Sequence, residues 1–394
     1  MTGRLFTIAN ALVCVLVLLP GAAVFAANGE KESVWYDDGL HLQSGTGVYT
    51  ALINWRAQLR YSNTDFDNDF GNPNADKDEL RLNRARFKIG GKLGASWLDY
   101  YAEYDFVRPA LLDFWLAPKV SEALNFRIGQ YKVPYNRERF DSSGKQQFAE
   151  RSVVTPSFTL DRQIGVTAMG RLFREQTIDS SYFIGIFLGN GRNGSRDRDG
   201  KPMVFGRWQW NIFKRVLPFS RSDIDRTRLP TASIAVGAAS NRSAFTRFSS
   251  DGGGELPAFS PGEEGQYDVD QAMVEFAFMY QGFSIQTEYH WKQIDDRVNR
   301  TSTEIDGFYF DTGYFFAEIF DWVPDPLETM ARIARVEPDV GDATPEETEL
   351  AIGGNWYFYG HRNKLTFDVT RSTGGSPSGN DDAWGIRFQW DVSF

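Results

Sequence analysis

The chain has 394 residues, a formal net charge of −10 and a mean hydropathy of −0.40. An acidic chain binds nucleic acid poorly, so nucleic acid is excluded as a general partner. Aromatic residues nevertheless make up 15% of the chain. This combination is typical of a transmembrane β-barrel, in which each strand shows lipid only half of its residues.

Residues 1–26 have the features of a secretory signal peptide. Arg4 gives a positive start, Leu12–Leu19 is a short apolar run, and Val24–Ala26 predicts a cleavage site. The alternative is an uncleaved anchor helix, but the apolar run is shorter than the roughly 20 residues that a membrane helix needs. The only cysteine, Cys14, lies in this peptide, so we expect an exported chain without disulfides.

Residues 27–45 are expected to form a short periplasmic lead, and residues 46–394 a barrel domain. No long apolar stretch follows the signal, so a membrane crossing would need strands closed into a barrel. Alternation with a period of two recurs instead. In 283–292, Phe283, Tyr289 and Trp291 lie on one face, and Glu288 and His290 lie on the other.

A soluble β-sandwich also alternates. Three features favour a barrel: apolar faces rich in Tyr, Trp and Phe, opposite faces rich in charge, and connections that alternate in length. Short turns are expected at Leu93–Ser96, Tyr280–Phe283 and Phe358–Arg362. The long polar stretches are 62–79, 133–162, 189–203, 241–268 and 372–383, and all of them fall on the outer side if the first strand leaves the periplasm.

The predicted fold is therefore an all-β transmembrane antiparallel barrel of about 16 strands, with long extracellular loops and short periplasmic turns. The least regular parts are the link 214–230 and the segment 304–338, either of which could hide or remove a strand pair. The expected strands are 46–61, 80–93, 96–107, 111–118, 123–133, 163–173, 180–189, 203–214, 230–241, 268–280, 283–293, 304–320, 329–338, 347–358, 361–372 and 383–394.

Two features point to partners in the outer membrane. The first long loop is rich in carboxylates, which could bind Ca²⁺ or bridge lipopolysaccharide through divalent ions; the alternative is a solvated acidic loop. These residues are Asp65, Asp67, Asp69, Asp76, Asp78 and Glu79. The last strand ends in Trp390, Val392 and Phe394, and a terminal aromatic on such a strand resembles the signal read by barrel-assembly machinery.

Several segments resemble the phosphate-selective porin O and P family. The Arg-rich segment 79–91 resembles its second strand and 101–106 its next strand, while 126–135 resembles the strand that enters its long third loop. Segments 148–152 and 161–166 resemble the turn and the exit of that loop; 353–358 and the terminal strand also fit. The resemblance implies a trimeric porin whose third loop folds into the lumen as a constriction. Some members carry anions past wall arginines, whereas other relatives have no established phosphate preference.

The alternation places many charges on the lumenal faces of the strands, where charged walls and pore diameter set selectivity. Arginine suits a basic wall because its planar fork matches oxyanions, although such residues could merely brace the barrel. The expected basic wall is Arg56, Arg60, Arg84, Arg86, Lys88 and Arg127, and the expected acidic wall includes Asp99, Glu103, Asp105 and Asp113. The expected constriction residues are Lys132, Arg137, Arg139, Lys145, Glu150 and Arg151.

These mixed charges predict an outer-membrane porin for passive diffusion of small hydrophilic solutes or ions, general or weakly selective, with phosphate as an open possibility. The alternative is a structural or ligand-binding barrel with a closed lumen that acts through its loops. No nucleophile turn is present and only His41, His290 and His361 are available, so no enzyme is expected. No cofactor or metal is predicted.

Overall fold

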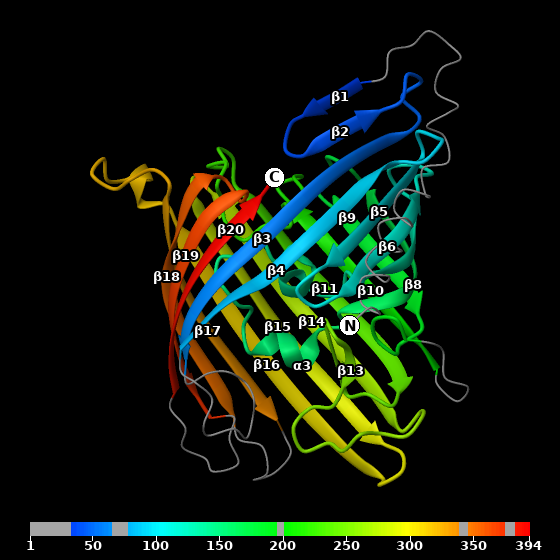
Figure 1. The fold of residues 1–394 in the computed structure, drawn as a ribbon. Helices are drawn as coiled ribbons and strands as arrows, with labels where there is room; N and C mark the ends of the chain where they lie inside the picture. Colours follow the sequence, from blue (N-terminus) through cyan, green and yellow to red (C-terminus); the bar gives the residue numbers. More distant parts are fainter. Residues whose placement is uncertain (1–32, 65–77, 195–200, 339–345, 375–382) are drawn as a thin grey trace, which may run out of the picture.

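The computed structural model describes residues 33–64, 78–194, 201–338, 346–374 and 383–394. The signal-peptide prediction for 1–26 and most of the acidic cluster in the first long loop lie outside these ranges. In the described part, 16 antiparallel strands form a closed barrel (Figure 1). The ring closes where the last strand pairs with the first, for example at Trp390 opposite Leu59.

Each of the expected strand segments overlaps one observed strand, as the period-two pattern predicts. The barrel strands are β3 (Thr50–Thr64), β4 (Asp78–Lys92), β5 (Leu98–Asp105), β6 (Ala110–Pro118), β7 (Asn125–Lys132), β8 (Arg162–Leu172), β9 (Ser180–Phe187), β10 (Lys201–Ile212), β11 (Thr231–Ser243), β14 (Tyr267–Tyr280), β15 (Phe283–Asp296), β16 (Thr301–Tyr314), β17 (Leu327–Pro338), β18 (Glu347–Tyr359), β19 (Asn363–Thr373) and β20 (Ala383–Ser393). Every strand pairs with its sequence neighbours.

The distribution of apolar and charged side chains is the reverse of that in a soluble protein. Large apolar residues such as Trp55, Ile186 and Phe388 are exposed on the outer face, while Arg60 and Glu275 are buried inside. This is the partition that a barrel in lipid requires, because its outer face meets hydrocarbon and its inner face meets polar groups. It excludes the β-sandwich alternative, in which the aromatic faces would pack against each other.

The end of the barrel where β3 begins and β20 ends carries the short turns, and we call it the periplasmic end. A hairpin of β1 (Ser33–Tyr36) and β2 (Leu40–Gln43) extends the sheet there by pairing with the start of β3 (Figure 1). Two connections at this end, 213–230 and 315–326, are exceptions to the short turns expected. The segment 304–320 was predicted as strand to its end, but β16 stops at Tyr314 and a 3-10 turn, η1 (Phe316–Glu318), follows.

Several segments enter the space inside the barrel, among them residues 244–266, which carry the hairpin β12 (Arg247–Ser249) and β13 (Gly252–Gly254). Residues 133–161, the constriction loop, contain α2 (Arg137–Phe140) and α3 (Val154–Phe158) and contact inward-facing side chains. Residues 213–230, the lumenal link, join β10 to β11 and reach the same region through Arg221. Neither α2 nor α3, nor any other helix among the described residues, is long and apolar enough to cross a membrane.

Candidate pore lining and constriction

The constriction loop is held to the barrel wall by buried ion pairs. Arg137 places its Nε 3.1 Å from Glu275 Oε1 on β14, and Arg207 on β10 binds both oxygens of the same carboxylate at 2.7 and 2.8 Å. Arg139 pairs with Asp161 at 2.5 Å. Because these groups are almost fully buried, the loss of one partner would leave an uncompensated charge.

Glu138 joins the constriction loop, the lumenal link and the wall. Its carboxylate accepts hydrogen bonds from the Ser152 backbone N–H at 2.8 Å, the Ser152 hydroxyl at 2.6 Å and the Thr155 hydroxyl at 2.8 Å. Arg221 Nη2 lies 2.9 Å away and Arg332 Nη2 3.8 Å away. Burial alone would raise the pKa of Glu138, but these cations and hydrogen bonds outweigh it and lower the pKa to about 2.

Asp141 has the opposite environment although it lies in the same loop. Its carboxylate is buried, and neither oxygen has a hydrogen-bond partner among the described residues. Burial raises the pKa of Asp141 to about 6, against the opposing effect of the nearby cations Arg137, Arg221, Arg151 and Lys132. Burial therefore raises the pKa of Asp141, whereas cations and hydrogen bonds lower the pKa of Glu138, Glu150 and Asp161 in the same loop.

Arg56 and Arg60, expected in the basic wall, lie buried beneath the constriction loop. Arg56 pairs with Asp391 on β20 at 2.6 Å and donates to the Ser143 hydroxyl at 2.8 Å. Arg60 pairs with Glu150 and donates to the Ala149 carbonyl at 2.7 Å. Both side chains act as braces between the loop and the wall.

The expected acidic wall is also occupied by ion pairs. Arg86 binds Glu103 and Asp105 at 2.8 Å each, and all three side chains are buried. Asp113 is bound by Arg162 at 2.8 and 3.1 Å. Asp99 pairs with Lys119 and stays partly exposed. The carboxylates of this wall are therefore largely neutralised by neighbouring cations.

A second group of cations remains half-buried, although Lys88 lies opposite Glu103 on the neighbouring strand. Within the described residues, no ion pair to a carboxylate is formed by Arg84, Lys88, Arg127, Lys132 or Arg151. Lys132 and Arg151 each donate to the Asp141 backbone carbonyl at 2.9 Å. Lys145 is exposed. These cations lie along β4, β7 and the neighbouring edge of the constriction loop.

Arg127 is fixed by aromatic rings instead of an acid. Its guanidinium carbon lies 4.5 Å from the ring centre of Trp115 and 5.3 Å from that of Tyr131. Tyr101 stacks on Trp115 at 5.4 Å. Stacking holds the guanidinium plane while leaving its charge available, which is the arrangement that Arg uses to bind oxyanions.

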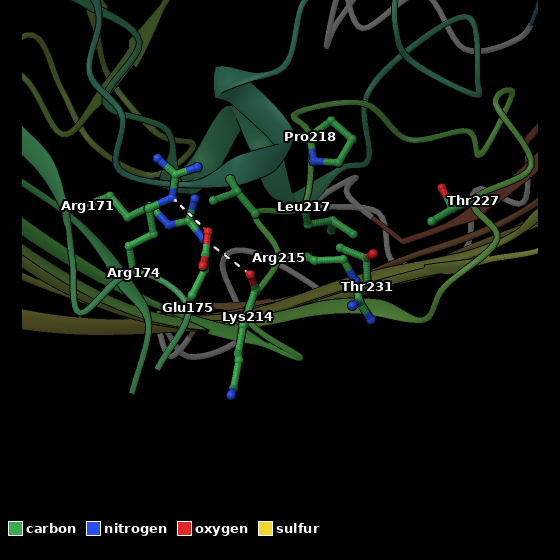
Figure 2. Close-up of a pocket in the computed structure, with 10 residues that line it drawn as sticks. Arg171, Arg174, Glu175, Lys214, Arg215, Leu217, Pro218, Thr227 and Thr231 are labelled. Carbon is green, nitrogen blue, oxygen red and sulfur yellow. Dashed lines mark hydrogen bonds and ion pairs between the residues drawn. The ribbon is translucent and has the colours of Figure 1, made fainter. Parts of the chain in front are cut away.

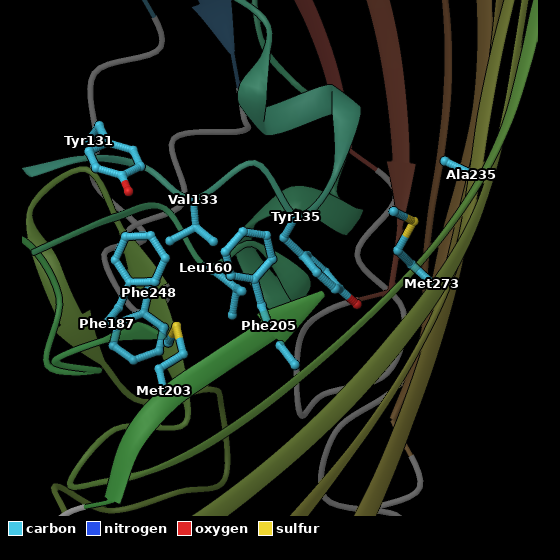
Figure 3. Packing of buried hydrophobic residues seen from close by; sticks show 11 residues of the cluster. Tyr131, Val133, Tyr135, Leu160, Phe187, Met203, Phe205, Ala235, Phe248 and Met273 are labelled. Atoms are coloured by element: carbon cyan, nitrogen blue, oxygen red, sulfur yellow. The ribbon is translucent and has the colours of Figure 1, made fainter. Parts of the chain in front are cut away.

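On the side of the lumen lined by β9 to β11, protein side chains fill the space, which the sequence analysis did not predict. Figure 3 shows apolar side chains from the constriction loop and from β9 to β11 packed inside the barrel, among them Val133, Leu160, Phe187 and Phe205. Farther round the ring, β15 turns Glu288 and His290 inward, and both are buried. One signal could have shown this: Met203 and Phe205 are large apolar residues on the inward face of β10, where a water-filled lumen would favour polar ones.

A cavity of about 420 Å³ lies at the periplasmic end beside the lumenal link (Figure 2). Its lining includes Arg171, Arg174, Lys214 and Arg215. Arg171 is bound by Asp179 at 2.5 Å and Arg174 by Glu175 at 3.3 Å, whereas Lys214 and Arg215 form no ion pair among the described residues. The cavity is a side pocket of the mouth and lies apart from the cations on β4 and β7.

Four arginines that organise the interior were not predicted as site residues. They are Arg162, Arg207, Arg221 and Arg332. Arg332 pairs with Asp311 directly opposite it on β16, whereas the partners of Arg207 and Arg221 lie 68 or more residues away and are brought close only by the fold. No group of three or more His, Cys, Asp or Glu side chains within the described ranges is arranged to hold a metal ion.

A closed 16-stranded barrel with a charged lumen and a loop across it defines the class of outer-membrane porins. The chain belongs to the phosphate-selective porin O and P family, whose model matches residues 53–210 and 262–389. This is a family of channels, not of enzymes. No curated protein matches the chain.

Solved outer-membrane channels share the fold at low sequence identity. The anion-selective porin from Comamonas acidovorans has a TM-score of 0.56 and 8% identity, covering 87% of this chain and 99% of that one. In-vitro folded OmpT of Vibrio cholerae has a TM-score of 0.55 and 9% identity, covering 88% and 97%. A trimer form of OmpT has a TM-score of 0.52 and 11% identity, covering 87% and 99%.

Proposed function

We propose that this porin is a passive diffusion channel for small hydrophilic solutes and that it prefers anions, inorganic phosphate among them. The observation that carries the proposal is the unequal exposure of the two charge types. The carboxylates Glu103, Asp105 and Asp113 are buried in ion pairs, whereas Arg84 and Arg127 are half-buried without one. An ion in the lumen would therefore meet more available positive than negative charge.

The proposed route runs between β4–β7 and the facing edge of the constriction loop. Arg84, Lys88, Arg127 and Lys132 line it on the wall side, and Arg151 lines it on the loop side. Glu150 is the exception, since 41% of its side chain is exposed, but Arg60 pairs with it. Cations on both sides of a narrow path lower the energy of an anion and raise that of a cation.

The test is the reversal potential in a salt gradient across planar bilayers. The triple variant Arg84→Gln, Lys88→Gln and Arg127→Gln should shift permeability from anions towards cations. A matched control is Arg297→Gln, which removes a half-exposed cation in the opposite turn between β15 and β16. If the wild-type current is carried mainly by cations, or if the triple variant matches the control, the proposed role of these cations is wrong.

A barrel with a closed lumen, acting through its loops, remains the second candidate. It is favoured by the buried inward faces of β14 to β17, where Glu275, Asp311 and Glu328 are inaccessible to solvent. Planar bilayers separate the two functions, because a channel gives steps of steady conductance and a closed barrel gives none.

Export and assembly complete the proposal. We infer that residues 1–26 are cleaved as a signal peptide and that residues 27–45 remain as the periplasmic lead. Phe394 would serve the barrel-assembly machinery; in the folded barrel its backbone N–H and carbonyl pair with Trp55 at 2.9 and 2.7 Å. A homotrimer, surrounded by lipid and lipopolysaccharide, is supported by the trimer form of OmpT. Mass measurement of the protein in detergent tests the trimer.

A further inference from the structure

The connection 315–326, which we call the docking arm, projects from the periplasmic end of the barrel. It contains η1 and appears in gold at the upper left of Figure 1, away from the ring of strands. Its side chains are unusually apolar for an exposed connection. Phe316, Ile319 and Phe320 are all exposed, and Trp322 is 81% exposed, the highest value among the large apolar residues described.

The aromatic rings of the docking arm continue the lipid-facing surface of the barrel without a gap. Phe278 and Phe283 face outward, because their neighbours Met279 and Ser284 are buried inside. From there, successive ring centres lie 6.3, 6.0, 5.0, 6.3 and 5.9 Å apart. The rings are, in order, Phe278, Phe283, Tyr314, Phe316, Phe320 and Trp322.

The base of the docking arm is anchored, so its rings do not fold back onto the barrel. The Arg226 guanidinium carbon lies 3.5 Å from the ring centre of Phe315. The same side chain pairs with Glu318 at 3.0 Å and donates to the Asp325 carbonyl at 2.8 Å. Within the arm, the Phe320 backbone N–H donates to the Phe316 carbonyl at 2.9 Å.

We propose that the docking arm binds the periplasmic leaflet of the outer membrane and inserts its rings at the boundary between headgroups and acyl chains. Trp and other aromatic side chains are favoured at that boundary because one part of the ring is apolar and the other can stay wet. Lipid is the binding partner that fits the docking arm, because the continuous row of rings extends a surface of the barrel that is already in lipid. The arm carries Glu318, Asp321 and Asp325, and Arg226 offsets one of these charges, so the arm is suited to zwitterionic and not to anionic phospholipid.

The test uses a single reporter, because the only cysteine, Cys14, lies in the segment that is removed as the signal peptide. The full barrel with Trp322→Cys carries a bimane label and is placed in nanodiscs of phosphatidylethanolamine and phosphatidylcholine with brominated acyl chains. The matched control is Val298→Cys, an exposed apolar residue in the turn at the opposite end. Brominated lipid should quench the label at 322 at least about twofold more than that at 298, and aqueous iodide should do the reverse.

A second variant keeps the proposal testable if the label alone disturbs the arm. Adding Phe320→Ser to the labelled protein should weaken lipid quenching at 322, because it interrupts the row of rings. Equal iodide quenching at both positions would overturn the proposal. The proposal would also be overturned if the label at 322 were protected from iodide only when protomers associate, whatever the lipid. The surface that covers the arm would then be a second copy of the chain.

Discussion

The buried cluster around Glu138 predicts that the lumenal link keeps the constriction loop in place. Arg221 is inaccessible to solvent and pairs with Glu138 in the loop and Asp311 on β16, while its backbone N–H donates to the Lys145 carbonyl at 3.3 Å. Breaking a buried ion pair costs about 3–5 kcal/mol. Arg332 still reaches Asp311 at 2.8 Å and Glu138 at 3.8 Å, so we expect about 3 kcal/mol for Arg221→Gln.

That loss should appear as movement of the loop, because the strands keep their ladder of backbone hydrogen bonds. A change of about 3 kcal/mol raises the population of the released loop about 100-fold. Single-channel recording of Arg221→Gln should show more frequent current fluctuations and a larger open conductance. The control Arg174→Gln removes an exposed ion pair near the same mouth and should change neither. Unchanged current in Arg221→Gln, with unchanged susceptibility of the loop to protease, would refute the reasoning.

Three further predictions address the pH response of the constriction loop, the apolar cluster inside the barrel and the acidic wall. The pKa of Asp141 is raised to about 6 in the fold, so the loop loses stability as pH rises from about 4 to about 6. Asp141→Asn should therefore raise the melting temperature at pH 7 and leave it unchanged at pH 3.5. Phe205→Ala should destabilise the barrel by about 3–5 kcal/mol in chemical unfolding, because it leaves a cavity in the apolar cluster inside the barrel. Arg162→Gln leaves Asp113 without its partner, so the reversal potential should shift towards cations.

The strand pattern could be predicted because it depends on the side-chain period alone. In β15, Phe283 and Tyr289 face outward while Glu288 and His290 face inward, as the alternation predicted. The same rule gave the order and direction of neighbouring strands, since an antiparallel barrel joins each strand to the next. It gave the link 214–230 but not its path into the barrel, and it extended the strand 304–320 over the start of the connection 315–326.

The role of each lumenal charge was decided only by the tertiary structure. Arg56 and Arg84 have the same parity on neighbouring strands and look equivalent in the sequence. Arg56 lies under the constriction loop and pairs with Asp391, which reaches it only because β20 closes the ring against β3. Arg84 donates to the Gln58 side-chain oxygen at 2.5 Å, forms no ion pair among the described residues and remains half-buried. Alternation determines which way a side chain points, whereas the availability of its charge depends on partners that chain folding brings from distant segments.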